Sequence, residues 1–119
     1  MELKEIMSLN NFVVVGDTFN PEKYAYKIKH ELLDNGYNVE CVYKELKSIN
    51  DVSFDIDCLV LCINSFKGLE LVKELKKDVK SIVIQPGAES TELLNYLKDN
   101  GYDYLEGCVL VGIRLYKKN

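Results

Sequence analysis

Short apolar runs alternate with amphipathic stretches along this chain. The apolar runs occupy residues 12–15, 39–43, 58–63, 81–84 and 104–111. Several of them are apolar at nearly every position, which is typical of parallel strands that are covered on both faces. We therefore predict five strand regions, the last bent at Gly107 and followed by a basic tail.

The segments between these strands show helical spacing of apolar residues. In the clearest case, Ala25, Ile28 and Leu32 fall at positions i, i+3 and i+7 of one helix. We expect Asn20 to cap this helix and Pro21 to be its first residue, with Gly36 ending it. Further helices are predicted over residues 2–8, 67–77 and 89–100, and a short helix or loop over residues 44–56.

Strands that alternate with helices in this way indicate a parallel sheet with helices on both of its faces. The predicted fold is a Rossmann-like, doubly wound α/β domain with a mainly parallel sheet of about five strands. A length of 119 residues fits a single domain over residues 1–119.

The net charge of the chain limits the classes of partner that it is expected to bind. A net charge of −4 argues against broad electrostatic binding to nucleic acid or to an anionic membrane, but it leaves room for a compact anionic ligand. No apolar run is long enough to span a bilayer, and residues 1–11 do not resemble a signal peptide. We expect a cytoplasmic protein.

The residues that most often bind metals or catalyse reactions form no recognisable motif. The four cysteines contain no CxxC pair and there is one histidine, so the sequence offers little for a zinc site. We expect reduced, partly buried thiols, and we expect His30 to be a solvated surface residue. Cys108 is the thiol that most merits a redox test.

Ligands of a doubly wound sheet bind at the carboxyl ends of its strands. Four loops meet at that edge, and they are rich in glycine, amides and hydroxyls, with Lys23 nearby. The backbone N–H groups of residues 16–18 and the Thr18 hydroxyl are expected to meet a pyrophosphate. The candidate binding residues are Gly16, Asp17, Thr18, Phe19, Asn20, Tyr43, Lys44, Asn64, Ser65, Lys67, Gln85, Pro86 and Gly87.

The first of these loops departs from the common phosphate-binding motifs. A glycine after a buried strand often forms only a tight turn. The dinucleotide pattern GxGxxG is absent, because Thr18 and Pro21 stand where its second and third glycines would be. The GKS or GKT of a P-loop is absent as well. Both departures argue against NAD and against a P-loop nucleotide site.

Several short motifs resemble the small stand-alone CoA-binding domain family, which is related to the CoA-binding domain of succinyl-CoA synthetase. The motifs are Val14-Val15-Gly16 followed by Pro21 and Tyr26, Gly36-Tyr37-Asn38-Val39, IVIQPGAES at residues 82–90, and Cys108. This resemblance covers roughly residues 10–113. It implies a Rossmann-like fold with CoA, or a similar adenine nucleotide, lying across the strand ends and residues 16–20 at its pyrophosphate.

The chain also departs from this family. Residues 41–44 read Cys-Val-Tyr-Lys where the family usually has Pro-Val-Asn-Pro, and Lys23 and Ala25 replace a common arginine and serine. Our first hypothesis is non-catalytic binding of CoA or an acyl-CoA, with a regulatory use. The alternatives are an NAD- or nucleotide-dependent oxidoreductase or transferase subunit, and a structural module with a vestigial pocket. A protein partner or a homo-oligomer is left open.

Overall fold

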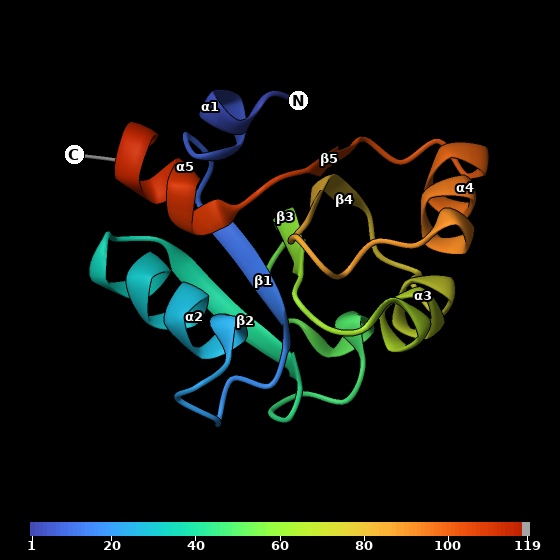
Figure 1. The fold of residues 1–119 in the computed structure, drawn as a ribbon, viewed down its shortest axis with the longest axis horizontal. Coiled ribbons are helices and arrows are strands. Elements are labelled where there is room, and N and C mark those ends of the chain that lie inside the picture. The colour runs from blue at the N-terminus through green and yellow to red at the C-terminus, as the bar shows by residue number, and fades with distance from the viewer. Residues whose placement is uncertain (118–119) are drawn as a thin grey trace.

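The computed structural model describes residues 1–117 and contains a five-stranded parallel sheet in the order β2-β1-β3-β4-β5 (Figure 1). The strands are β1 (Asn11–Gly16), β2 (Asn38–Tyr43), β3 (Ile56–Leu61), β4 (Val79–Ile84) and β5 (Tyr104–Glu106). The helices are α1 (Leu3–Ile6), α2 (Tyr24–Asp34), α3 (Ser65–Lys73), α4 (Thr91–Asp99) and α5 (Val109–Tyr116), with a 3-10 turn, η1, at Ile49–Asp51. The doubly wound, Rossmann-like α/β prediction is confirmed.

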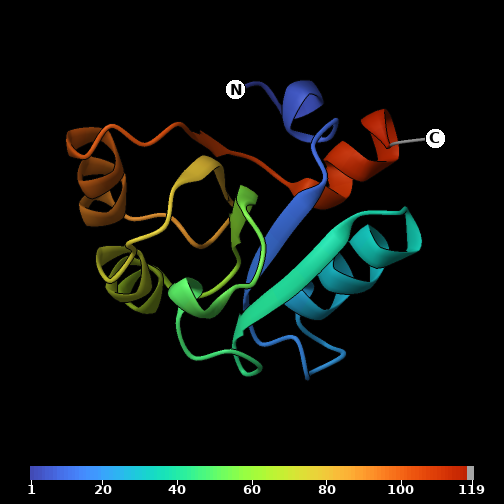
Figure 2. The same ribbon diagram turned by 180° about the vertical axis from the view of Figure 1, so that it is seen from behind.

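Helices cover both faces of this sheet, as Figures 1 and 2 show from opposite sides. On one face, Phe12 and Val14 of β1 pack in a cluster with residues of α1, α2 and α5. On the other face, Val13 and Val15 pack in a second cluster with residues of η1, α3 and α4. The alternation follows from the two-residue period of a strand and explains why β1 is apolar at every central position.

The short helix α1 is tied to the sheet by one tyrosine. The Tyr37 hydroxyl donates a hydrogen bond of 2.6 Å to the backbone oxygen of Met7. The Tyr37 ring meets Phe12 edge to face, with the ring centroids 5.0 Å apart. A buried hydroxyl with a partner and an apolar ring both stabilise this contact, so the start of the chain is anchored against α2, α5 and the sheet.

The strand register aligns the carboxyl ends of the strands at one edge. Gly16 pairs with Tyr43, and Leu61 pairs with Ile84. Strand β1 lies between β2 and β3, so the chain leaves β1 in one direction and returns on its other side. The strand order reverses there, and such a point is where doubly wound sheets place their ligands.

The start of α2 differs from the prediction. The helix begins at Tyr24, with Lys23 at the N-cap position, so Asn20 is not the cap and Pro21 is not the first helical residue. Instead, the Asn20 side chain accepts a hydrogen bond of 3.0 Å from the Glu22 backbone N–H and forms a separate turn. The loop after β1 is therefore longer than expected. The stop at Gly36 is confirmed, with φ +86°.

The end of the chain also differs. The strand predicted over residues 104–111 stops at Glu106, and α5 begins at Val109. An apolar run of this length is compatible with either a strand or a buried helix. Here a hydrogen bond with a residue distant in sequence favours the helix. The buried Gln85 side chain accepts a hydrogen bond of 2.7 Å from the Val109 backbone N–H, which holds the first turn of α5. Lys118 and Asn119 of the predicted basic tail lie outside the described residues.

Other helix and strand boundaries differ by a few residues from the predicted ones. The expected strand over residues 58–63 runs from Ile56 to Leu61, which places Cys62 and Ile63 in the following loop. The helix expected over residues 67–77 begins at Ser65, after Asn64 caps it. The short helix or loop expected over residues 44–56 is confirmed over residues 44–55 as η1 and its flanking turns, while Ile56 already belongs to β3.

Candidate functional site

A cavity of about 460 Å³ opens at the carboxyl edge of the sheet, where the strand order reverses. Its volume lies within the range usual for small-molecule sites. The residues lining it come from the segments after β1, β2, β3 and β4: Asp17, Lys23, Tyr24, Ala25, Tyr43, Lys44, Cys62, Ile63, Asn64, Gln85, Pro86, Gly87 and Ala88. We call this the carboxyl-edge cavity.

Gly16 makes a close approach of three segments possible beneath this cavity. A Cβ atom at this position would lie 2.3 Å from the backbone oxygen of Cys62 and 2.8 Å from the Cβ of Ala25. The end of β1, the segment after β3 and the first turn of α2 can therefore meet only because residue 16 has no side chain. This contact brings the loop that begins at Asp17 against the loop that follows β3.

Tyr43 at the end of β2 has an unusual backbone. Its φ is +111°, which a residue with a bulky side chain rarely adopts and which costs about 1–3 kcal/mol. Two hydrogen bonds close the turn that imposes it: Tyr43 N–H to the Leu46 oxygen at 2.7 Å, and Leu46 N–H to the Cys41 oxygen at 3.0 Å. The turn presents Tyr43 and Lys44 to the cavity, with the Lys44 ammonium 5.3 Å from the Tyr43 ring centroid.

Thr18 is turned away from the cavity lining and is buried. Its hydroxyl donates a hydrogen bond of 2.8 Å to Oε2 of Glu45, and Nζ of Lys29 lies 2.9 Å from the same oxygen. Burial opposes the ionisation of Glu45, but the hydrogen bonds from Lys29 and Thr18 outweigh it and lower the pKa of that carboxyl. The same hydrogen bond raises the pKa of Lys29. This group links the loop after β1 to the turn after β2 and to α2.

The segment after β4 connects the cavity to α5. Gln85 is buried, and besides the bond from Val109 its Nε2 lies 3.4 Å from the Cys108 sulfur. Gly87 has φ +94° and turns the chain, and its N–H donates a hydrogen bond of 3.1 Å to Glu89. The cavity wall and the first turn of α5 therefore share one amide side chain.

The segment after β3 contributes the cap of α3. Asn64 accepts a hydrogen bond of 2.9 Å from the Lys67 N–H, while Nζ of Lys67 pairs with Glu70 at 2.8 Å. Cys62 lines the cavity, and burial raises the pKa of its thiol to about 11. A thiol with this pKa stays protonated at neutral pH and is a poor nucleophile.

The cavity brings together seven of the thirteen candidate residues and leaves six outside its lining. The seven are Asp17, Tyr43, Lys44, Asn64, Gln85, Pro86 and Gly87; the six are Gly16, Thr18, Phe19, Asn20, Ser65 and Lys67. Gly16 lies beneath the cavity as described, and Phe19 is 62% exposed. All thirteen assignments stay predictions.

Six lining residues were absent from the candidate list: Lys23, Tyr24, Ala25, Cys62, Ile63 and Ala88. The misplaced boundaries account for four of them, whereas Lys23 was already expected near these loops. A helix starting at Pro21 would have carried Tyr24 and Ala25 away from the loop, and a strand reaching Ile63 would have left Cys62 and Ile63 inside the sheet. The charged residues that line the carboxyl-edge cavity are two lysines, Lys23 and Lys44, and one aspartate, Asp17.

Residues 1–117 contain no group of three or more histidine, cysteine, aspartate or glutamate side chains placed to hold a metal ion. Within the same residues, no helix is long and apolar enough to cross a membrane.

The fold and the cavity define a doubly wound α/β protein with a ligand-sized cavity at its switch point. The family model described as a CoA binding domain matches residues 10–114, and the chain belongs to this family. The match covers nearly the whole chain and supports CoA binding in general. A comparison with curated proteins finds no match.

Solved structures share the fold. A conserved hypothetical protein from Pyrococcus furiosus is 28% identical, with a TM-score of 0.76 over 87% of this chain and 98% of that one. A Thermus thermophilus protein is 20% identical, with a TM-score of 0.79 over 96% of this chain and 98% of that one. A hypothetical protein from Pyrococcus horikoshii is 20% identical, with a TM-score of 0.81 over 96% and 89% of the two chains.

The close approach at Gly16 can be tested with alanine substitutions at two glycines. Gly16→Ala places a methyl against the Cys62 carbonyl and should lower the free energy of unfolding by about 1–3 kcal/mol or more. Gly68→Ala is the matched control. Its Cβ would meet the Ile63 side chain at an ordinary 3.5 Å and residue 68 lies inside α3, so this change should raise the free energy of unfolding by at most about 1 kcal/mol. Urea unfolding measures both. Equal effects of the two changes would contradict the packing described for Gly16.

The contact of Glu45 with Thr18 and Lys29 predicts that the free energy of unfolding depends on pH. Because the folded-state pKa of Glu45 is lowered, its charge stabilises the fold above the ordinary pKa, and this contribution is lost as pH falls through the folded-state value. Glu45→Gln should therefore cost roughly 0.5–1 kcal/mol near neutral pH and progressively less below about pH 4. Glu70→Gln, which removes an exposed ion pair, is the control and should change little. A deficit for Glu45→Gln that stays constant across this range in urea unfolding would refute the contact.

Proposed function

We propose that this chain binds CoA or an acyl-CoA in the carboxyl-edge cavity and does not transform it. The observation that carries the proposal is the coincidence of two findings: the CoA binding domain match over residues 10–114, and a cavity at the switch point of the matched fold. Neither would be enough alone, because many folds of this kind serve other ligands.

The charges at the cavity suit the phosphate groups of CoA. Lys23 and Lys44 approach from α2 and from the turn after β2, and they supply positive charge in a chain whose net charge is −4. Lys67 is engaged with Glu70 and contributes less. In this proposal the backbone at Asp17 and the two lysines receive the phosphates.

The remaining lining suits the other parts of the ligand. The Tyr43 ring lines the cavity beside the Lys44 ammonium and offers a flat surface for the adenine. Ala25, Ile63 and Ala88 offer apolar contacts to the pantetheine arm.

The same lining supports binding without catalysis. Asp17 is its one carboxylate among the described residues, and this side chain accepts a hydrogen bond of 3.1 Å from the Phe19 N–H. The Cys62 thiol is held protonated by burial. An acid and base pair or an activated nucleophile would be needed for group transfer, and neither stands at the cavity. A cytoplasmic role in sensing CoA levels or regulating a partner fits this chemistry.

Binding measurements with two lysine variants test the proposal. CoA should raise the melting temperature of the wild-type chain, and the double change Lys23→Ala with Lys44→Ala should weaken its affinity about tenfold or more in titration calorimetry. Lys98→Ala, an exposed lysine on α4, is the control and should bind like the wild type.

Parallel titrations with NAD and ATP separate the alternatives. No melting shift with CoA would overturn the proposal. Tighter binding of NAD than of CoA would favour the oxidoreductase or transferase hypothesis. An unchanged CoA affinity in the double lysine variant would show that the phosphates of CoA do not bind at the carboxyl-edge cavity.

A further inference from the structure

The Glu45 carboxylate lies outside the lining of the carboxyl-edge cavity, yet it contacts segments on two sides of that cavity. Its Oε2 accepts hydrogen bonds from the Thr18 hydroxyl at 2.8 Å and from Nζ of Lys29 at 2.9 Å. The Cys41 thiol lies against the same carboxylate. Burial, and then the charge of Glu45, raise the pKa of this thiol to about 12, so it stays protonated and able to donate. One acidic side chain therefore joins the loop after β1, helix α2 and strand β2.

Thr18 attaches the loop after β1 to this carboxylate. Thr18 is 2% exposed, and a buried hydroxyl that loses its partner costs free energy, so the bond to Glu45 favours one position of the loop. The Asp17 side chain accepts its hydrogen bond from the Phe19 N–H, which belongs to the same loop. The contact between Thr18 and Glu45 therefore helps to fix where Asp17 stands at the cavity.

Glu45 also belongs to the turn that presents two of the lining residues. Tyr43 and Lys44 precede it directly, and both line the cavity. The φ of +111° at Tyr43 is unfavourable, and such a backbone persists only where the surrounding contacts hold it. The two backbone hydrogen bonds of the turn close it on itself and on the end of β2. The Glu45 side chain is what ties the closed turn to α2 and to the loop after β1.

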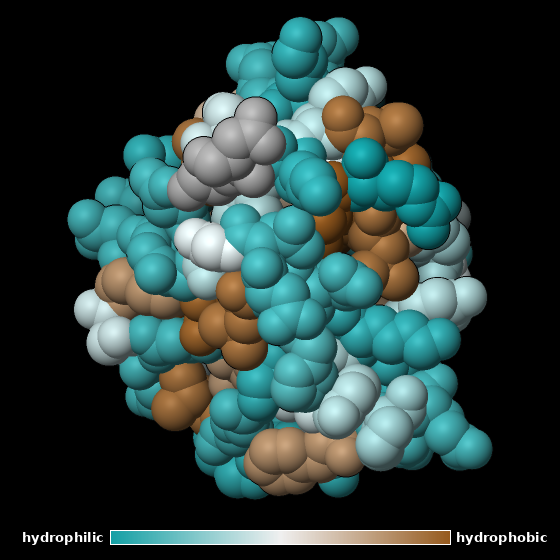
Figure 3. Space-filling view, turned by 90° about the vertical axis from the view of Figure 1, so that its left-hand side faces the viewer, coloured by the Kyte–Doolittle hydropathy of each residue, from teal (hydrophilic) through white to brown (hydrophobic). Residues whose placement is uncertain are grey.

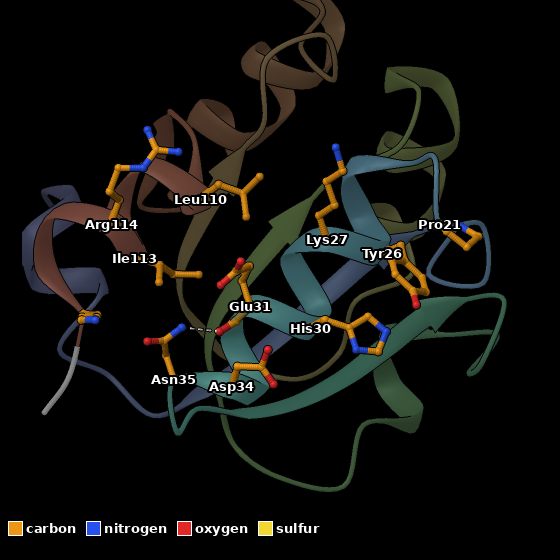
Figure 4. A pocket seen from close by; sticks show the side chains of 11 residues that line it. Pro21, Tyr26, Lys27, His30, Glu31, Asp34, Asn35, Leu110, Ile113 and Arg114 are labelled. Atoms are coloured by element: carbon orange, nitrogen blue, oxygen red, sulfur yellow. Dashed lines mark hydrogen bonds between the residues drawn. The ribbon is translucent and has the colours of Figure 1, made fainter.

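Helix α2 uses different side chains for this contact and for a second groove. That groove, of about 620 Å³, lies between α2 and α5, and Figure 4 shows Tyr26, His30 and Glu31 of α2 along it. Figure 3 views this side of the molecule, where hydrophobic side chains form separate patches among polar ones. Lys29 does not line the groove, and its ammonium pairs with Glu45 instead. A change at Glu45 therefore acts on the carboxyl-edge cavity and leaves the groove lining as it is.

Asp57 offers a comparison at the opposite edge of the sheet. It accepts hydrogen bonds from the N–H groups of Asn10 at 3.2 Å and Asn11 at 2.9 Å, and it pairs with Nζ of Lys80 at 3.1 Å. Burial opposes the ionisation of Asp57, but these contacts outweigh it and lower the pKa of the carboxyl, as at Glu45. Asn11 begins β1 and Asp57 lies near the start of β3, so this contact joins the amino ends of the strands. The candidate site is at the other edge, with Glu45.

The contacts of Glu45 therefore suit a role in ligand binding that does not require touching the ligand. We propose that Glu45 is a positioning residue of the CoA site, which holds the loop after β1 and the turn after β2 in the arrangement that receives the phosphates. This role rests on the function proposed above. It explains how Asp17, from one segment, and Lys44, from another, are placed at one cavity.

Titration calorimetry with CoA, at a temperature where every variant is folded, measures this role. Glu45→Gln keeps the shape of the side chain and removes its charge, so it should weaken CoA binding about tenfold. Asp57→Asn is the matched control, because it removes a bonded charge at the amino edge. It should lower the melting temperature and leave the CoA affinity unchanged. Equal losses of affinity in both variants would make Glu45 a general contributor to stability and would overturn the proposal.

A second variant separates positioning from direct contact with the ligand. Thr18→Val removes the hydroxyl and should weaken CoA binding about three- to tenfold. The double change Thr18→Val with Glu45→Gln should bind CoA like Glu45→Gln alone, because both changes break the same contact. Losses that add in the double variant would show that the Thr18 hydroxyl acts on the ligand independently of Glu45, and would contradict the proposal.

Amide hydrogen exchange of the ligand-free chain tests the positioning without CoA. The N–H groups of Tyr43 and Leu46 close the turn. In Glu45→Gln they should exchange about tenfold faster than in the wild type, while in Asp57→Asn their exchange should be unchanged. Wild-type exchange at both amides in Glu45→Gln would show that the turn does not need this side chain, and the proposal would be wrong.

The calorimetry also distinguishes two failures. Absence of CoA binding by the wild-type chain would refute the proposed function, and the role of Glu45 with it. Wild-type binding of CoA, with an unchanged affinity in Glu45→Gln, would refute the role of Glu45 alone.

Discussion

The rest of the structure depends on the absence of a side chain at residue 16. With a hydrogen in place of a Cβ, β1 can end against the Cys62 carbonyl while the first turn of α2 packs from the other side at Ala25. These three segments define the floor of the carboxyl-edge cavity and the point where the strand order reverses. Any larger residue would separate β1 from the segment after β3 and would open the junction on which the cavity rests.

Polar contacts between distant segments then fix the walls around that junction. The Glu45 carboxylate holds Thr18 and Lys29, so the turn after β2 and the loop after β1 are positioned together. Gln85 performs a similar role on the far side by joining the segment after β4 to the start of α5. The candidate ligand surface and helix α5 are therefore connected through one buried amide.

Much of this architecture could be predicted from local sequence pattern. Continuous apolar runs and helical spacing were sufficient for the parallel sheet and its covered faces. The boundaries of the helices and strands could not be predicted in this way, because they depend on contacts between residues far apart in sequence. The turn made by Asn20 delays α2 to Tyr24, and the bond from Val109 to Gln85 converts the end of an expected strand into α5. Those shifts hid Cys62 and Ile63 from the predicted site. The role of Thr18 with Glu45, 27 residues away, had no local signal.

The central claim is that CoA occupies the carboxyl-edge cavity. Backbone amide chemical shifts recorded during a CoA titration test it most directly, because every segment of the chain reports separately. We predict saturable shifts at Asp17, Tyr43, Asn64 and Gly87, with α4 unaffected. Shifts concentrated on residues outside this cavity, or no shifts at saturating CoA, would contradict the account.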